Sequence, residues 1–165
     1  MPQSECVLDG RSLTIESVVR VARDPTTRVG IRPEARRALH ASRGLVDRAI
    51  ESGHTIYGIN TGFGKLANVR IPPDQIDQLQ TNLIRSHASG VGDPLPPSVV
   101  RAVMLLRANV LLRTTSGVRP ELVEALVALL NAGVLPVVPE QGSVGASGDL
   151  APLSHIGLAL MGEGR

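Results

Sequence analysis

Residues 121–133, ELVEALVALLNAG, carry the pattern that decides the fold class of this chain. Leu, Val and Ala occupy almost every side of the helix that this segment predicts, and a helix that is apolar nearly all round is normally buried. Gly133 follows the last periodic residue, where glycine commonly ends a helix. We therefore expect a helix over 121–132 that is buried among other packed helices.

Further helices are predicted on both sides of this segment. Apolar residues at helical spacing, separated by glycine and proline, indicate helices over 15–22, 33–52, 76–87, 98–114 and 150–161. Short extended segments are predicted at 54–59 and 134–138, where the helical spacing is absent. Because no internal repeat or low-complexity tract divides the chain, residues 1–165 are expected to form one mainly α-helical unit.

The composition excludes several classes of partner. Seventeen Lys and Arg residues against 15 Asp and Glu residues leave a net charge of +2, which gives no concentrated field for nucleic acid or anionic lipid. The two aromatic residues, Tyr57 and Phe63, are too few for a base-stacking surface. The most apolar stretch, 122–138, is interrupted by polar residues and a proline, so no membrane span is expected. The N-terminus lacks a signal-peptide pattern, and a cytoplasmic location is expected.

The sequence indicates neither a metal site nor a nucleotide site. Cys6 is the sole cysteine, which excludes an internal disulfide and a thiolate cluster. The four histidines show no metal-ligand spacing. Neither 58–65 nor 142–149 supplies the GxxxxGK[ST] pattern of a phosphate-binding P-loop. We therefore expect no metal ion and no nucleotide cofactor.

A loop of small residues, GSVGASGD at 142–149, precedes the predicted helix at 150–161. Such a loop can be a phosphate-binding turn or a flexible connection. Ala146 and Gly148 also leave the backbone uncrowded, and Gly148 can adopt dihedral angles closed to other residues. If the amide nitrogen of Gly148 attacks the carbonyl carbon of Ala146, a five-membered ring forms. Loss of two waters, one involving the Ser147 hydroxyl, then leaves an exocyclic methylidene, which is an electrophile made from the backbone itself.

Three stretches together resemble the aromatic amino acid ammonia-lyases. The sequence GSVGASGDLAPLSH at 142–155 is similar to the family signature, whose Ala-Ser-Gly tripeptide cyclises to 4-methylidene-imidazol-5-one (MIO). The sequence YGINTGFG at 57–64 is similar to the family's tyrosine loop, and SHASGVG at 86–92 to its substrate-selectivity segment. The resemblance implies the helical N-terminal part of the ammonia-lyase (fumarase/aspartase-like) architecture. It also implies that MIO forms autocatalytically from Ala146, Ser147 and Gly148.

The resemblance also implies roles for Tyr57, Ser86 and His87. Tyr57, as phenolate, would remove the β-proton of an amino acid substrate; the alternative is a core aromatic with a bonded hydroxyl. Ser86 and His87 occupy positions that track the substrate in the family, and the pair Ser-His is that of members acting on histidine. A polar pair can hydrogen-bond an imidazole, whereas a phenyl ring would leave it unpaired. Without the resemblance, His87 would be taken as a core residue of an apolar helix stripe.

Other residues are expected to shape the site rather than react. His155 lies inside the signature helix and is expected to fix the loop by packing or hydrogen bonding. The residues expected to shape the two loops are Asn60, Gly62, Gly64 and Asp149.

Family members are much longer than this chain, so the resemblance implies an N-terminal segment without the C-terminal helix-bundle region. The expected whole protein is a homotetrameric lyase that converts the small-molecule amino acid L-histidine to urocanate and ammonia. Two alternatives stay open. The first is a tyrosine or phenylalanine ammonia-lyase or an aminomutase that uses the same electrophile, and the second is a non-catalytic truncated fragment.

Overall fold

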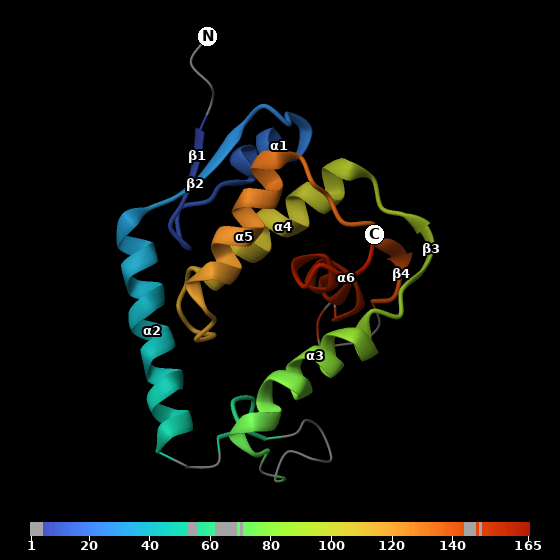
Figure 1. Cartoon of the computed structure of the whole chain (residues 1–165). Helices are drawn as coiled ribbons and strands as arrows, with labels where there is room; N and C mark the ends of the chain where they lie inside the picture. The colour runs from blue at the N-terminus through green and yellow to red at the C-terminus, as the bar shows by residue number, and fades with distance from the viewer. Residues whose placement is uncertain (1–4, 53–55, 62–68, 70, 144–147, 149) are drawn as a thin grey trace.

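The computed structural model describes residues 5–52, 56–61, 69, 71–143, 148 and 150–165 (Figure 1). Helices dominate this part of the chain, and every helix expected from the sequence is present with its ends within three residues of the prediction. They are α1 (Ile15–Arg23), α2 (Pro33–Glu51), α3 (Ile76–His87), α4 (Pro97–Leu111), α5 (Pro120–Ala132) and α6 (Leu150–Leu160), with a short 3₁₀ helix η2 (Pro73–Gln75) before α3. The prediction of a mainly α fold is confirmed.

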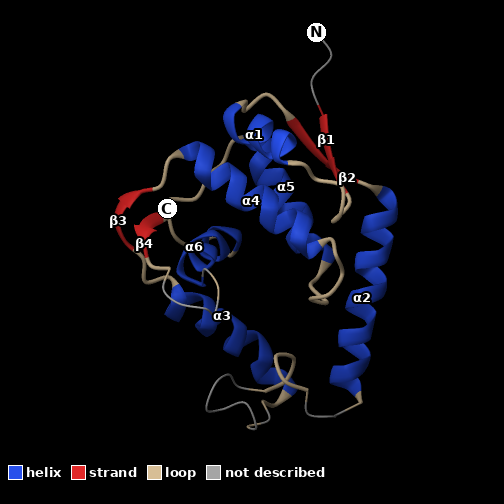
Figure 2. Cartoon of the chain, turned by 180° about the vertical axis from the view of Figure 1, so that it is seen from behind, coloured by secondary structure: helices blue, strands red, loops and turns tan. Residues whose placement is uncertain are grey.

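Two small sheets, which the sequence did not predict, lie at opposite sides of the helices (Figure 2). Strand β1 (Glu5–Leu8) pairs in parallel with β2 (Arg28–Ile31). Strand β3 (Val91–Pro94) pairs antiparallel with β4 (Pro139–Gln141). Each strand has four residues or fewer, which is too short for an alternating pattern to stand out in the sequence.

The structure differs from the prediction of an extended segment at 54–59, of which residues 54 and 55 lie outside the described residues. Residues 57–59 form a turn, in which the amides of Ile59 and Asn60 donate to the Ile56 carbonyl at 3.1 and 3.2 Å. The Asn60 side chain closes this turn by accepting from the Ile56 amide at 2.8 Å, and such local bonds outweigh the β preference of the isoleucines. Residues 134–138, predicted as an extended lead-in, belong to no helix or strand and lead into β4.

The core is built around α4 and α5, which lie side by side (Figure 1). On α5 the side chains of Val123, Leu126 and Leu130 are at most 1% exposed, so the predicted burial of this helix is confirmed. Gly133 ends α5 with a φ of 71°, the left-handed conformation expected of a glycine cap. The buried residues of α4 are Val100, Arg101, Met104, Leu105, Ala108 and Leu111.

A buried arginine joins three helices at this core. Arg101 on α4 is 4% exposed. Its Nε donates to the Val21 carbonyl at 2.9 Å and its Nη1 to the Leu130 carbonyl at 3.2 Å. Both carbonyls lie in the last turn of their helices, α1 and α5, where carbonyl groups lack a helical partner and a cation is favoured. The guanidinium therefore satisfies two helix ends at once.

The first sheet is attached to α5 through the amide side chain of Asn131. Its Nδ2 donates to the Val29 carbonyl and its Oδ1 accepts from the Val29 amide, both at 2.8 Å. The side chain thus pairs with the free edge of β2 as a neighbouring strand would. This explains a polar residue within an otherwise apolar helix.

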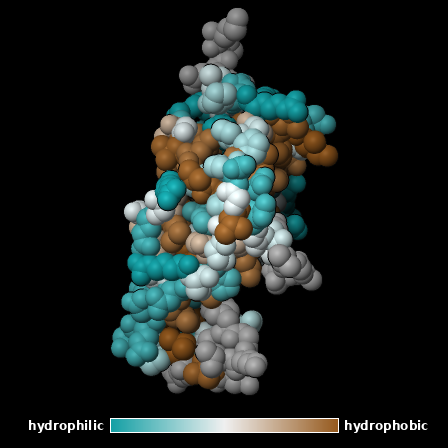
Figure 3. All heavy atoms as spheres, turned by 90° about the vertical axis from the view of Figure 1, so that its right-hand side faces the viewer, coloured by the Kyte–Doolittle hydropathy of each residue, from teal (hydrophilic) through white to brown (hydrophobic). Residues whose placement is uncertain are grey.

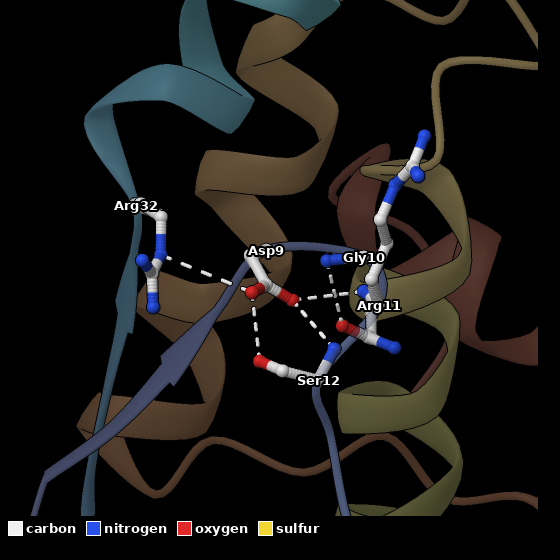
Figure 4. A network of polar contacts seen from close by, with 6 residues as sticks. Asp9, Gly10, Arg11, Ser12 and Arg32 are labelled. Atoms are coloured by element: carbon white, nitrogen blue, oxygen red, sulfur yellow. Dashed lines mark hydrogen bonds and ion pairs between the residues drawn. The ribbon is translucent and has the colours of Figure 1, made fainter.

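The turn after β1 is held by the carboxylate of Asp9 (Figure 4). Its Oδ1 accepts from the amides of Arg11 and Ser12 at 2.8 Å, and its Oδ2 accepts from the Ser12 hydroxyl at 2.7 Å. These hydrogen bonds lower the pKa of Asp9 to about 2. Gly10, with a φ of 83°, is buried there, and a Cβ on it would lie 2.9 Å from the backbone of Leu112. Only glycine fits this approach of the turn to the end of α4.

Burial is uneven along the longest helix, α2. Ala35 and Leu39 near its start are buried, whereas Leu45 is 62% exposed, and Figures 1 and 2 show the second half of α2 leading away from α4 and α5. Figure 3 shows hydrophobic side chains at the surface among hydrophilic ones. In the part of the chain that the structure describes, none of the helices has the length and apolar character to cross a membrane.

Adjacent leucines on α4 provide a matched test of the core. Leu105 is fully buried and Leu106 is 45% exposed. Leu105→Ala is expected to lower the free energy of unfolding by about 2–5 kcal/mol because it leaves a cavity, and Leu106→Ala by about 1 kcal/mol or less. Urea unfolding followed by circular dichroism measures both. Equal losses for the two variants would contradict this description of the core.

The Asp9 turn predicts a dependence of stability on pH. Folding lowers the pKa of Asp9 from 3.8 to about 2. The ionised carboxylate therefore stabilises the fold fully at a pH above the unfolded-state pKa of 3.8. This contribution is lost as the pH falls through the folded-state pKa of about 2. The stability difference between the unsubstituted chain and Asp9→Asn should therefore shrink between pH 5 and pH 2. A titration of the Asp9 carboxyl carbon by NMR should have its midpoint near pH 2. A midpoint near the ordinary value of 3.8 would show that the turn does not bind the carboxylate.

Candidate active site

A small open pocket brings together two of the sequence motifs. Its volume is about 180 Å³. One side is formed by Ser86, His87 and Ser89 at the end of α3, and the other by residues around the start of α6. The latter residues are Gly142, Gly148, Leu150 and Ala151. Ser86, His87 and Gly148 thus line the same space, although Gly148 is far from the other two in the sequence.

The last turn of α3 determines which ring nitrogen of a neutral His87 carries the proton. Nδ1 of His87 lies 2.8 Å from the Leu83 carbonyl oxygen and 3.1 Å from Ser86 Oγ. The Ser86 hydroxyl also donates to the Leu83 carbonyl, at 2.9 Å. Because a carbonyl only accepts, the ring proton of a neutral His87 belongs on Nδ1, and Nε2 is left as an acceptor.

The segment after His87 is held against α6 and the second sheet. The Gly90 amide donates to Nε2 of His155 on α6 at 3.2 Å. A Cβ on Gly90 would lie 3.0 Å from this nitrogen, and a Cβ on Gly142 would lie 3.1 Å from the Gly90 Cα. The two backbones therefore approach each other at glycines, where no side chain separates them. The sequence predicts that His155 fixes the loop at 142–149, whereas the hydrogen bond in the structure joins it to Gly90 outside that loop, so the role at the loop remains a prediction.

An ion pair spans α3 and the residues after α6. Nε of Arg85 lies 3.0 Å from Oε2 of Glu163, and Nη2 of Arg85 binds the other carboxylate oxygen. These hydrogen bonds hold the pKa of Glu163 below its usual value. Because both groups are exposed, the pair adds little to stability. It links α3 to the residues that follow α6.

Just before α6, the backbone adopts a conformation that favours glycine. Gly148 has a φ of 93°, and a Cβ on it would meet nothing within 4 Å. The Leu150 amide donates to the Gly148 carbonyl at 3.0 Å. The other residues predicted for this loop, Ala146, Ser147 and Asp149, lie outside the described residues.

The predicted base, Tyr57, lies in the turn that Asn60 closes. Tyr57 is 62% exposed and does not line the pocket of Ser86 and His87, whereas Asn60 is 3% exposed. The Asn60 carbonyl accepts from the Ile71 amide at 2.9 Å, so this residue holds the turn from both its backbone and its side chain. Gly62 and Gly64 lie outside the described residues, and the roles of all these residues remain predictions.

Two other kinds of reactive group, a cysteine thiolate and a metal-binding cluster, can be examined in the described part of the chain. Burial raises the pKa of the Cys6 thiol, which disfavours the reactive thiolate. Among the residues that the structure describes, no three His, Cys, Asp or Glu side chains gather closely enough to hold a metal ion.

Sequence reasoning missed the close approach of Gly90 and Gly142. Both glycines lie in stretches that resemble the family, but their contact joins residues that are distant in sequence. The one sequence feature that indicates such a contact is the glycines themselves, since a glycine outside a turn often marks a close backbone approach. No feature of the sequence indicates the ion pair of Arg85 and Glu163, which are 78 residues apart.

Comparison with known proteins adds independent evidence. The family model described as aromatic amino acid lyase matches residues 13–165. The histidine ammonia-lyase of Geobacillus thermodenitrificans is 57% identical over 158 residues, which are 96% of this chain and 31% of that protein. The chain thus spans about a third of the length of the curated relatives it matches.

Solved structures of related enzymes share the fold of this segment. The histidine ammonia-lyase from Trypanosoma cruzi is 42% identical with a TM-score of 0.87, and 97% of this chain covers 30% of that one. A tyrosine aminomutase from Streptomyces globisporus is 38% identical with a TM-score of 0.89 over the same shares. The family match covers most of the chain and agrees with the three sequence motifs and with the fold. The chain belongs to the aromatic amino acid lyase family.

Proposed function

We propose that residues 1–165 form the N-terminal segment of an enzyme that eliminates ammonia from L-histidine and releases urocanate, a histidine ammonia-lyase. One observation supports this above all: Ser86, His87 and Gly148 line the same pocket. That pocket joins the segment whose sequence indicates histidine to the tripeptide whose sequence indicates an electrophile. The similarity to histidine ammonia-lyases points to the same substrate.

The electrophile is MIO, formed from Ala146, Ser147 and Gly148. The left-handed φ of Gly148 and the open space around its Cα suit a backbone that turns back on itself. When formed, the ring supplies an electron sink for the elimination of ammonia, which needs one because the β-proton is barely acidic and the amine is a poor leaving group. No metal ion or nucleotide takes part in this scheme.

Ser86 and His87 bind the side chain of the substrate. The bond from His87 Nδ1 to the Leu83 carbonyl leaves Nε2 as an acceptor for an imidazole N–H. A phenyl ring has no such donor and would leave the polar pair unpaired, which disfavours phenylalanine. The pocket of about 180 Å³ is smaller than the roughly 300–1,000 Å³ of complete ligand sites, so the rest of the enzyme is expected to contribute further walls.

Tyr57, as phenolate, takes the β-proton of the substrate. The bonds of Asn60 hold the turn that carries Tyr57, and Gly62 and Gly64 shape the loop that follows. Asp149 helps to hold the tripeptide at the start of α6. The exposure of Tyr57 suits a residue on a loop that moves over the site when substrate binds.

The whole enzyme is expected to be a cytoplasmic homotetramer with a small amino acid as its only required partner. The net charge of +2 offers no basis for binding nucleic acid or a membrane. Residues 1–165 act as one segment of this enzyme, to which a C-terminal helix-bundle region adds the remaining active-site residues. Alone, the chain is expected to be inactive.

A second candidate is a tyrosine aminomutase or lyase that uses the same electrophile. The likeness of the fold to a tyrosine aminomutase favours it. The two candidates differ in substrate, so turnover of histidine and of tyrosine decides between them. Formation of a β-amino acid from tyrosine without urocanate from histidine would replace our proposal by the second candidate.

The proposal predicts that the Ser147 hydroxyl is required for activity. In the complete enzyme, Ser147→Ala should lower kcat with histidine on the order of 10³-fold or more because no methylidene can form. Urocanate absorbance measures turnover, and intact mass shows whether two waters are lost. The complete enzyme is this chain with its continuation beyond Arg165 or, where the gene holds none, residues 1–165 fused to the remainder of the G. thermodenitrificans relative.

The control for this experiment is Ser116→Ala, in an exposed loop outside the motifs, which should retain normal activity and the mass loss. Unchanged activity of Ser147→Ala would refute the assigned electrophile.

The proposal also predicts that His87 sets the substrate preference. His87→Leu should lower kcat/KM for histidine by about 100-fold relative to kcat/KM for phenylalanine because the acceptor for the imidazole N–H is removed. Steady-state kinetics with both amino acids measures this ratio. His40→Leu, at an exposed position on α2, is the matched control. A ratio that changes equally in both variants would show that His87 does not select the substrate.

A further inference from the structure

The contact between His155 and Gly90 connects the two sides of the candidate site. Nε2 of His155, on α6, accepts from the Gly90 amide at 3.2 Å. An amide N–H can only donate, so Nε2 must carry its lone pair and the ring proton of the neutral imidazole must lie on Nδ1. His155 does not line the pocket with the described residues of the site. Its influence on the site therefore passes through the backbone of Gly90.

This contact lies within a tightly packed junction. A Cβ on Gly90 would lie 3.0 Å from His155 Nε2 and 3.2 Å from the Cβ of Pro139 at the start of β4. A Cβ on Gly142 would lie 2.9 Å from the Cβ of Ala151 and 3.1 Å from the Gly90 Cα. The backbone at Gly90 thus packs closely against His155 of α6 and against the segment from Pro139 to Gly142.

The packing around Gly90 affects the distance between Ser86–His87 and Gly148. Ser86 and His87 precede Gly90 by a few residues, and the Ser89 amide donates to the His87 carbonyl at 2.8 Å. On the other side, α6 begins two residues after Gly148 and carries His155 in its second turn. A shift of Gly90 away from α6 would therefore change the separation between the substrate-binding pair and the tripeptide.

We infer that His155 is a positioning residue that holds the segment 88–90 against α6 and so sets the distance between Ser86–His87 and Gly148. This role rests on the proposed function of those residues. His155 acts on the substrate through Gly90 and exchanges no proton with it. What the role requires is a hydrogen-bond acceptor at the position of Nε2.

Two substitutions of His155 in the complete enzyme distinguish the effect of its hydrogen-bond acceptor from the effect of its size. His155→Gln keeps an acceptor, because the amide oxygen can receive the Gly90 N–H. His155→Leu has a similar size and no acceptor. The expected result is that Leu lowers kcat/KM for histidine by about tenfold, since small displacements of binding groups are costly, while Gln stays within about threefold of the unsubstituted enzyme. The mass loss of two waters should be the same in all three proteins.

A second measurement reports the contact without activity. Amide hydrogen exchange of the peptide containing Gly90 should be faster in His155→Leu and near normal in His155→Gln, because the acceptor protects this amide. Gly90→Ala serves as an independent variant if His155→Leu fails to fold. Its added Cβ would displace the segment and should lower kcat/KM for histidine with normal mass loss, since the φ of Gly90 is not among the left-handed ones.

The outcomes distinguish this inference from the proposed function. Equal Gly90 exchange in the unsubstituted, Gln and Leu proteins, or equal kcat/KM in Gln and Leu, would overturn the role of His155 while leaving the proposed function intact. Absence of urocanate formation by the unsubstituted complete enzyme would overturn the proposed function and this role with it. Rescue by Gln in both measurements would support the role.

Discussion

The packing of α4 against α5 is the contact on which the rest of the segment depends. The two helices are joined by a short connection and bury their leucine and valine side chains against each other. The start of α4 therefore lies beside the end of α5, as the bond from Arg101 to the Leu130 carbonyl shows. Strand β3 precedes α4 and β4 follows α5, so the same packing brings these strands together. Without it, neither sheet nor pocket would have a fixed position.

The candidate site lies at the far end of this arrangement. The amide of Leu95 donates to the carbonyl of Val138 at 2.8 Å beside the β3–β4 pair, and this places the segment after α3 next to the segment before α6. Gly90 and Gly142 then allow the two backbones to meet, and Ser86–His87 and Gly148 come to line one pocket. Close backbone contacts thus contribute to the geometry of the site, and glycines stand where these contacts occur.

The comparisons indicate that this framework serves more than one reaction. Ammonia-lyases and aminomutases share the fold of the segment at high TM-scores, so the framework itself does not choose the substrate. Under our proposal, that choice depends on side chains that line the pocket. Ser86 and His87 are two of these, and both are hydrogen-bonded to the Leu83 carbonyl in the last turn of α3.

The sequence by itself determined the helices and the family. Helix signals are local, since Thr14 caps α1 by accepting from the Ser17 amide and Gly133 ends α5 within a few residues of the apolar pattern. The three motifs are likewise continuous stretches and could be compared with a family directly. The turn at Tyr57 was missed because local bonds there outweigh propensity, which a periodic pattern does not reveal. Tertiary structure alone decided the strands, the burial of Arg101 and the bond from Gly90 to His155. Each of these depends on a partner distant in sequence, about which a periodic pattern carries no information.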